Sequence, residues 1–139
     1  MAHMTLSEIE VFLQPPRHAI IAANTDGPPH ISPVWYVYEA GRLHFTISTG
    51  MAKYRHLHRD PHLSACVDGC HPDWRTVMLY GTVEFIPYGQ PLEEEMFWRI
   101  MKRYYENEAE AIEFGQSIRD ETRRLAVMTI EKTVSQDLR

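Results

Sequence analysis

Cysteine, excess positive charge and long apolar runs are scarce or missing in this sequence, and each shortage excludes a class of protein. With only 2 cysteines among 139 residues, the chain has no disulfide framework, which favours a reducing compartment and predicts a cytoplasmic protein. Lys and Arg number 14 against 19 Asp and Glu, so a nucleic-acid partner bound through bulk charge is not expected. No apolar run approaches the roughly 20 residues of a membrane-spanning helix, so we expect no membrane partner.

The composition that is present is typical of a folded domain. Hydrophobic residues make up 44% and charged residues 24%, close to the averages of globular proteins and unlike those of disordered chains. At about 100–200 residues per domain, the length predicts one domain. We expect residues 1–4, which contain a second methionine, to be an expression scar, and residues 5–139 to form the domain. Residues 5–14 are acidic and amphipathic, unlike a signal peptide.

Turn signals divide most of the chain into strands. Runs of β-branched and aromatic residues predict six strands, at residues 17–24, 30–38, 42–49, 63–68, 75–86 and 125–133. Helical patterns predict a short helix capped by Thr5 or Ser7, a crossover helix over 52–59, and a helical pair near 97–105 and 109–117. Pro33 has no N–H to donate, so its strand should lie at an edge or a bulge. Hairpin-linked strands with few helices favour a mainly β, antiparallel barrel.

The most informative segment is residues 46–55, where a strand rich in hydroxyl groups ends at Gly50 and a helix begins. A helix N-terminus offers unpaired N–H groups and the positive end of the helix dipole. Ser48, Thr49 and Lys53 would add donors and a full charge, which predicts a phosphate site. The alternative is an ordinary helix cap with a solvated lysine.

Several segments, taken together in this order, resemble one known superfamily. They are Asp26-Gly27-x-x-His30-x-Ser32-Pro33-Val34-Trp35-Tyr36, then Thr49-Gly50, Lys53-x-Arg55-x-Leu57-x-Arg59-Asp60-Pro61, Cys66-Val67-Asp68 and Gly81-Thr82-Val83. This order is similar to that of the pyridoxamine 5′-phosphate oxidase-like, FMN-binding split barrels, in the branch labelled as dependent on the deazaflavin coenzyme F420. The resemblance covers about residues 12–86.

The resemblance implies a six-stranded antiparallel split β-barrel with short flanking helices. It also implies a homodimer that holds its cofactor in a cleft between the subunits. Carried over by position, the cofactor-binding residues are Ser32, Val34, Trp35 and Tyr36 at the ring, Thr46, Ser48 and Thr49 at the ribityl chain and phosphate, Lys53 at the phosphate, and Thr76. Two positions depart from the family: Met51 stands where relatives often carry Arg, and Gln136 where many carry Trp.

The function implied by the resemblance is that of a flavoprotein-like oxidoreductase. A hydride would pass between coenzyme F420 or FMN and a small organic acceptor such as an enone, quinone, imine or nitro compound, with F420 slightly favoured. The cofactor carries this chemistry, so no catalytic nucleophile is required. Tyr36, His30 and His71 are candidate proton donors. A non-catalytic carrier that binds FMN, F420 or a tetrapyrrole such as haem in the same cleft is the alternative.

Other clusters of reactive residue types have simpler interpretations. Cysteines and histidines gather between residues 56 and 71, but their spacing fits no structural zinc pattern, so no metal is expected. The aromatic residues of 97–105 fit a core or an interface better than a substrate pocket. Arg119, Arg123 and Arg124 are expected to form surface or interface ion pairs.

Overall fold

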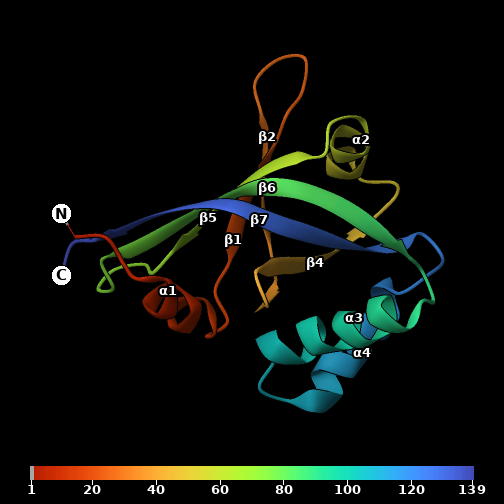
Figure 1. The fold of residues 1–139 in the computed structure, drawn as a ribbon. Coiled ribbons are helices and arrows are strands. Elements are labelled where there is room, and N and C mark those ends of the chain that lie inside the picture. The colour runs from red at the N-terminus through yellow and green to blue at the C-terminus, as the bar shows by residue number, and fades with distance from the viewer. Residues whose placement is uncertain (1) are drawn as a thin grey trace.

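The fold is built on one curled antiparallel sheet with four helices (Figure 1). The structure, a computed structural model, describes residues 2–139. Seven strands lie in the order β2-β1-β5-β6-β7-β4-β3. Their bounds are β1 Ala19–Ala23, β2 His30–Val34, β3 Val37–Glu39, β4 Arg42–Ser48, β5 His62–Asp68, β6 Arg75–Pro87 and β7 Arg123–Asp137. The helices are α1 Leu6–Leu13, α2 Ala52–Arg59, α3 Pro91–Tyr104 and α4 Glu108–Ile118.

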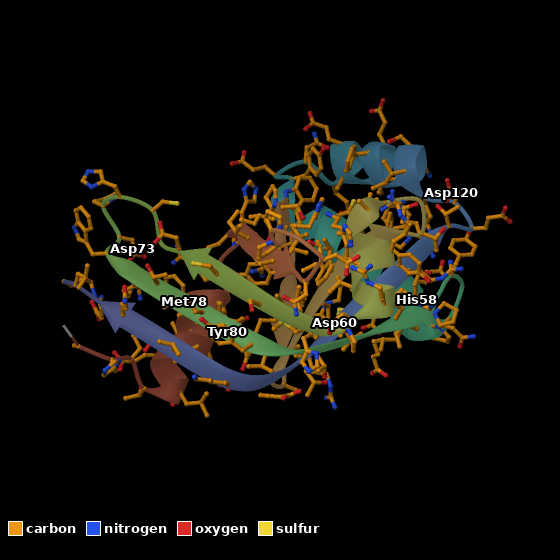
Figure 2. The ribbon with its side chains drawn as sticks, turned by 90° about the horizontal axis from the view of Figure 1, so that it is seen from above. His58, Asp60, Asp73, Met78, Tyr80 and Asp120 are labelled. Atoms are coloured by element: carbon orange, nitrogen blue, oxygen red, sulfur yellow. The ribbon has the colours of Figure 1, made fainter. Side chains whose placement is uncertain are left out.

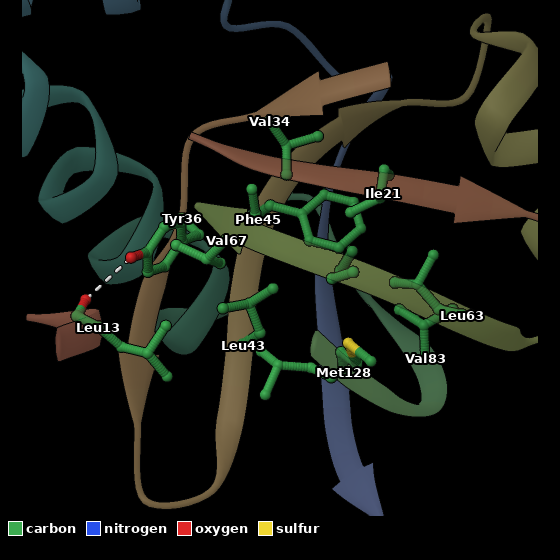
Figure 3. Packing of buried hydrophobic residues seen from close by; sticks show 14 of the residues in the cluster. Leu13, Ile21, Val34, Tyr36, Leu43, Phe45, Leu63, Val67, Val83 and Met128 are labelled. Atoms are coloured by element: carbon green, nitrogen blue, oxygen red, sulfur yellow. Dashed lines mark hydrogen bonds between the residues drawn. The ribbon is translucent and has the colours of Figure 1, made fainter. Parts of the chain in front are cut away.

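The sheet curls because its two edge strands are neighbours in the chain. β2 and β3 lie at opposite ends of the strand order, yet only Trp35 and Tyr36 separate them in sequence. The sheet must therefore bend until its edges approach, which produces the expected mainly β split barrel. Its interior is filled by a cluster of buried residues that includes Ile21, Phe45 and Met128 (Figure 3).

The barrel has one strand more than the sequence predicts. The single strand expected at residues 30–38 is broken at Trp35 and Tyr36, so it becomes β2 and β3. The Tyr36 N–H donates a hydrogen bond to the Tyr104 hydroxyl, at 3.1 Å, and not to a neighbouring strand. The expectation for Pro33 is confirmed, because β2 is an edge strand.

The two longest strands, β6 and β7, form the central pair of the sheet. Their register shifts by one residue after Tyr80, where Gly81 passes close to the partner strand. A Cβ atom at Gly81 would lie 1.9 Å from the Thr129 carbonyl oxygen, so only glycine fits there. β7 also continues four residues beyond its expected end at 133, to Asp137.

The N-terminal segment packs more fully than expected. Thr5, not Ser7, caps α1, and Glu8 completes a capping box with it. Residues 2–4, expected to lie outside the fold, are packed against it: Ala2 bridges to Asp137 and Met4 is buried. Leu6, the first residue of α1, is 67% exposed, whereas Ile9, Phe12 and Leu13 are buried.

Helices α3 and α4 form a second layer against one part of the sheet (Figure 1). Their apolar residues make a second buried cluster with residues of β3 and β7, among them Phe97, Ile100 and Leu125. This confirms the core interpretation for Phe97. The carboxylate of Glu93 in α3 is buried and accepts two hydrogen bonds from Arg119, at 2.7 and 2.8 Å. Among residues 2–139, no helix has the length and apolar content needed to cross a membrane.

Candidate functional site

A cavity of about 330 Å³ lies where the broken strand, the N-terminus of α2 and the two late helices converge. Its lining is apolar and aromatic on most sides and carries two cations. The lining residues are His18, Pro33, Val34, Trp35, Thr46, Met51, Lys53, Met101, Phe114, Ile118 and Arg123. Four of the nine predicted site residues are therefore brought together here: Val34, Trp35, Thr46 and Lys53.

Lys53 stands in the first turn of α2 and reaches the cavity wall. Burial, and to a smaller extent the charge of Arg123, lowers the pKa of its amine. Within residues 2–139, no carboxylate lies within 4 Å of this amine. The helix cap at Met51 makes no side-chain hydrogen bond, so the first turn of α2 lacks the side-chain acceptor that an ordinary cap would supply.

Two hydroxyl groups predicted to meet a ligand are buried without a partner. The side-chain oxygens of Ser32 and Thr46 accept and donate no hydrogen bond among the described residues. Such orphaned groups are uncommon in folded proteins, because each one lost its bonds to water on burial. Thr46 belongs to the cavity lining, although its hydroxyl oxygen itself is buried. Because Lys53 lines the same cavity, a ligand with an anionic end fits there.

Arg123, at the start of β7, is the largest departure from expectation. It is only 8% exposed and lines the cavity, and it forms none of the ion pairs among the described residues, so the expected surface or interface ion pair is not present. Burial lowers the pKa of its guanidinium, an effect that Asp120 and Glu93 partly oppose. Arg119 does form an ion pair, with the buried Glu93. No local sequence signal marks Arg123, because its place depends on pairing with Ser48, far away in the chain.

The apolar wall of the cavity is organised around Trp35. Its ring stacks on that of Tyr104, with ring centroids 4.9 Å apart and planes within 8°. The ring centroid of Phe114 in α4 lies 5.8 Å from that of Trp35. The Tyr104 hydroxyl donates to the Arg17 carbonyl at 2.6 Å, which ties the end of α3 to the segment before β1. His18, whose ring lies 6.3 Å from that of Tyr104, completes this side. His18 and Phe114 were not predicted as site residues.

The remaining predicted residues lie outside the cavity lining. Tyr36 is fully buried in the core and donates its hydroxyl to the Leu13 carbonyl at 3.0 Å (Figure 3). The Ser48 hydroxyl is bonded to that of Thr122 at 2.8 Å, and the Thr49 N–H to the Thr122 carbonyl at 3.0 Å. Thr76 donates to Asp68 at 2.8 Å. Their roles at a cofactor stay predictions.

The candidate proton donors are likewise dispersed. His30 faces His56, with ring centroids 5.6 Å apart, and His71 faces Trp74 at 5.2 Å. Neither lines the cavity, whereas His18 does. Across residues 2–139, no three His, Cys, Asp or Glu side chains are grouped so as to hold a metal ion.

Comparison with known proteins supplies the relationship that the geometry alone does not. A conserved hypothetical protein of Mycobacterium tuberculosis aligns with a TM-score of 0.79 and 24% identity, over 96% of this chain and 85% of its own. An F420 reductase aligns with a TM-score of 0.68 and 21% identity, over 89% and 94%. HutZ, the haem storage protein of Vibrio cholerae, aligns with a TM-score of 0.73 and 16% identity, over 95% of both chains. These likenesses show the shared fold.

The curated proteins include no match to this chain. The family model described as pyridoxamine 5′-phosphate oxidase, however, matches residues 5–137, which is nearly the whole sequence. The resemblance read from residues 12–86 thus extends through the late helices and β7. The chain belongs to the pyridoxamine 5′-phosphate oxidase family of split barrels.

Proposed function

We propose that this protein is an oxidoreductase that binds a flavin-type cofactor, coenzyme F420 or FMN, in the cavity beside Trp35. The observation that carries the proposal is the combination of two unlike groups of side chains in one cavity lining. One group provides positive charge, because the Lys53 amine has no carboxylate within 4 Å among residues 2–139. The other group consists of apolar and aromatic side chains. An aromatic ring that carries a phosphate on a polar chain matches both groups.

In this proposal the residues of the chain bind and orient, and the cofactor carries the redox chemistry. Bound there, a flavin-type ring would supply a hydride to a small organic acceptor. Val34 and Trp35 pack against the ring, and Lys53 and Thr46 hold its phosphate and side chain. Met101 and Ile118 from α3 and α4 exclude water from this side. The structure of an F420 reductase with this fold supports the cofactor class.

We also propose that the chain forms a homodimer through the outer face of the sheet. Strand pairing places Pro33, Ile20, Cys66, Met78 and Val134 directly opposite one another across β2, β1, β5, β6 and β7. None of these side chains is buried. Figure 2 shows Met78 and Tyr80 on β6 with no helix in front of them.

This face also connects with the site. Thr76, Met78 and Tyr80 occupy every second position of β6 and therefore lie on the same face of the sheet. Pro33 belongs to the same row and also lines the cavity. In a dimer formed through this face, Thr76 of one subunit would approach the cofactor bound by the other subunit. Thr76 would then have the cofactor-binding role that the resemblance implies. The two cysteines are free, in keeping with a cytoplasmic location, and no nucleic-acid or membrane partner is part of the proposal.

The test is a fluorescence titration of the purified protein with FMN and, separately, with F420. Lys53→Ala should weaken binding of the preferred cofactor by about 1.5–3 kcal/mol, because a charge-assisted bond to phosphate is lost. Lys102→Ala is the matched control, since Lys102 pairs with Glu108 at the surface. Saturable binding followed by oxidation of the reduced cofactor on adding acceptors supports an enzyme. Binding without turnover supports a carrier, and binding of neither cofactor contradicts the proposal.

A haem carrier is the second candidate, and His18 is the observation that favours it. A histidine in the wall of an apolar cavity is a common haem iron ligand, and the likeness to a haem storage protein points the same way. Titration with haemin distinguishes the two candidates. A Soret shift that His18→Ala abolishes would favour haem, whereas tight FMN or F420 binding with no haemin response would exclude it.

A further inference from the structure

Arg123 places a second positive charge in the cavity. It is the first residue of β7 and pairs with Ser48 at the end of β4. Its side chain shares the cavity lining with Met51 and Lys53, which come from the N-terminal end of α2. Arginine is seldom this buried without a carboxylate partner, because a charge removed from water needs an opposite charge or several hydrogen bonds.

The guanidinium of Arg123 lacks such a partner. Its Nε donates to the Ile118 carbonyl at 2.9 Å, and neither terminal nitrogen is bonded to any other residue of the described chain. The two acids whose charges it feels are engaged elsewhere. Asp120 accepts two hydrogen bonds from Thr122, and Glu93 accepts two from Arg119. The terminal nitrogens therefore remain as an open fork, a geometry that suits the oxygens of a phosphate.

The two cations also oppose each other. After the larger effect of burial, the charge of Arg123 also lowers the pKa of Lys53, so the two cations lie close enough to repel each other. An anion that binds between them would relieve this repulsion and gain attraction from both.

We propose that Arg123, together with Lys53, binds the phosphate of the flavin-type cofactor. The inference rests on the proposed function and deepens it. It also accounts for the methionine at position 51, where the resemblance predicts an arginine: this chain supplies the second cation from β7 instead of from the start of α2. The bound chemical group is a phosphate ester. FMN carries it as a monoester and F420 as a diester.

Binding of cofactors with and without phosphate tests this role. FMN is compared with riboflavin, and F420 with its phosphate-free deazaflavin riboside, for the wild type and three variants. Arg123→Gln should raise the dissociation constant of the phosphorylated cofactor about 10- to 100-fold and leave that of the phosphate-free form nearly unchanged. Arg123→Lys should fall between, because it keeps the charge and loses the fork. Arg124→Gln, whose side chain bonds backbone carbonyls, is the control.

A second measurement needs no cofactor. Inorganic phosphate should raise the Tm of the wild type and not that of Arg123→Gln, because only the former keeps both cations. Equal losses for phosphorylated and phosphate-free cofactors, or no loss for either, would overturn the role of Arg123. If the wild type binds none of the four compounds, the proposed function fails. The rise in Tm caused by inorganic phosphate is then the only test of the anion site at Arg123 and Lys53. A wild type whose Tm does not rise with phosphate would overturn that site as well.

Discussion

Tyr36 connects the segment between the two edge strands, β2 and β3, with two helices. Its hydroxyl donates to the carbonyl of Leu13, the last residue of α1, and its N–H donates to the hydroxyl of Tyr104 at the end of α3. The Arg103 guanidinium lies 5.1 Å from the centre of its ring. Burial, and after it the nearby Tyr104, raises the pKa of Tyr36 to about 12, although Arg103 acts in the opposite direction.

This shift predicts a loss of stability at high pH. The folded protein keeps its Tyr36 proton up to about pH 12, whereas the unfolded chain loses it near pH 10. The stabilisation is therefore complete below pH 10 and falls as pH rises from 10 to about 12, by roughly 2–3 kcal/mol. Urea unfolding at several pH values measures it. Tyr36→Phe should flatten this part of the profile, and an unchanged slope in that variant would contradict the assignment.

At the residue scale, local pattern identifies one residue of the cavity lining. A hydroxyl-rich strand that runs into a helix points to Lys53, which lines the cavity, and to Ser48 and Thr49, which do not. Thr46 is predicted only by the family resemblance. Tyr36 belongs to the same predicted strand as Trp35, but the break in that strand turns it into the core. Arg123 and His18 reach the cavity through strand pairing and helix docking, which no local pattern reports.

Among the elements, α3 and α4 are fixed to each other by one buried ion pair. Glu93 is 1% exposed, accepts two hydrogen bonds from Arg119 and takes a third from the Gly89 N–H. The Arg119 guanidinium is also flanked by the rings of Tyr88 and Phe97. The pair thus joins the end of α4 to the start of α3, and these helices supply one side of the cavity.

Glu93→Gln should destabilise the fold by about 3–5 kcal/mol, because it leaves the Arg119 charge buried without its partner. Arg99→Gln is the matched control: Arg99 pairs with Glu39 at the surface, so its loss should cost about 1 kcal/mol or less. Chemical denaturation measures both. If the two substitutions lower the free energy of unfolding equally, the buried Glu93–Arg119 pair stabilises the fold no more than a surface ion pair.

The elements themselves were largely predictable. The helix at 52–59 and the helical pair follow from periodicity and from proline, and their existence is confirmed. The strand at 30–38 was predicted whole because its β-branched and aromatic run is continuous. Its break comes from closure of the sheet and from the hydroxyl of Tyr104, which are long-range effects.

For the whole molecule, the uncovered face of the sheet predicts self-association. Met78→Asp would place a charge in the middle of the apolar row that crosses five strands, from β2 to β7, and a buried unpaired charge opposes an interface. We expect the wild type to be a dimer by light scattering and Met78→Asp to be a monomer with weaker cofactor binding. Val11→Asp, on the exposed side of α1, is the control. A monomeric wild type, or a dimer unaffected by Met78→Asp, would refute this interface.

The short, nearly meeting edges of the sheet have a consequence for aggregation. A free edge strand can recruit a strand from another molecule and begin a growing fibre. Here one edge, β3, has only three residues, and the other, β2, contains Pro33, which cannot donate to a new neighbour. Open-ended growth by strand addition is thus blocked at both edges. The barrel can expose an apolar face to a specific partner without also offering a template for polymerisation.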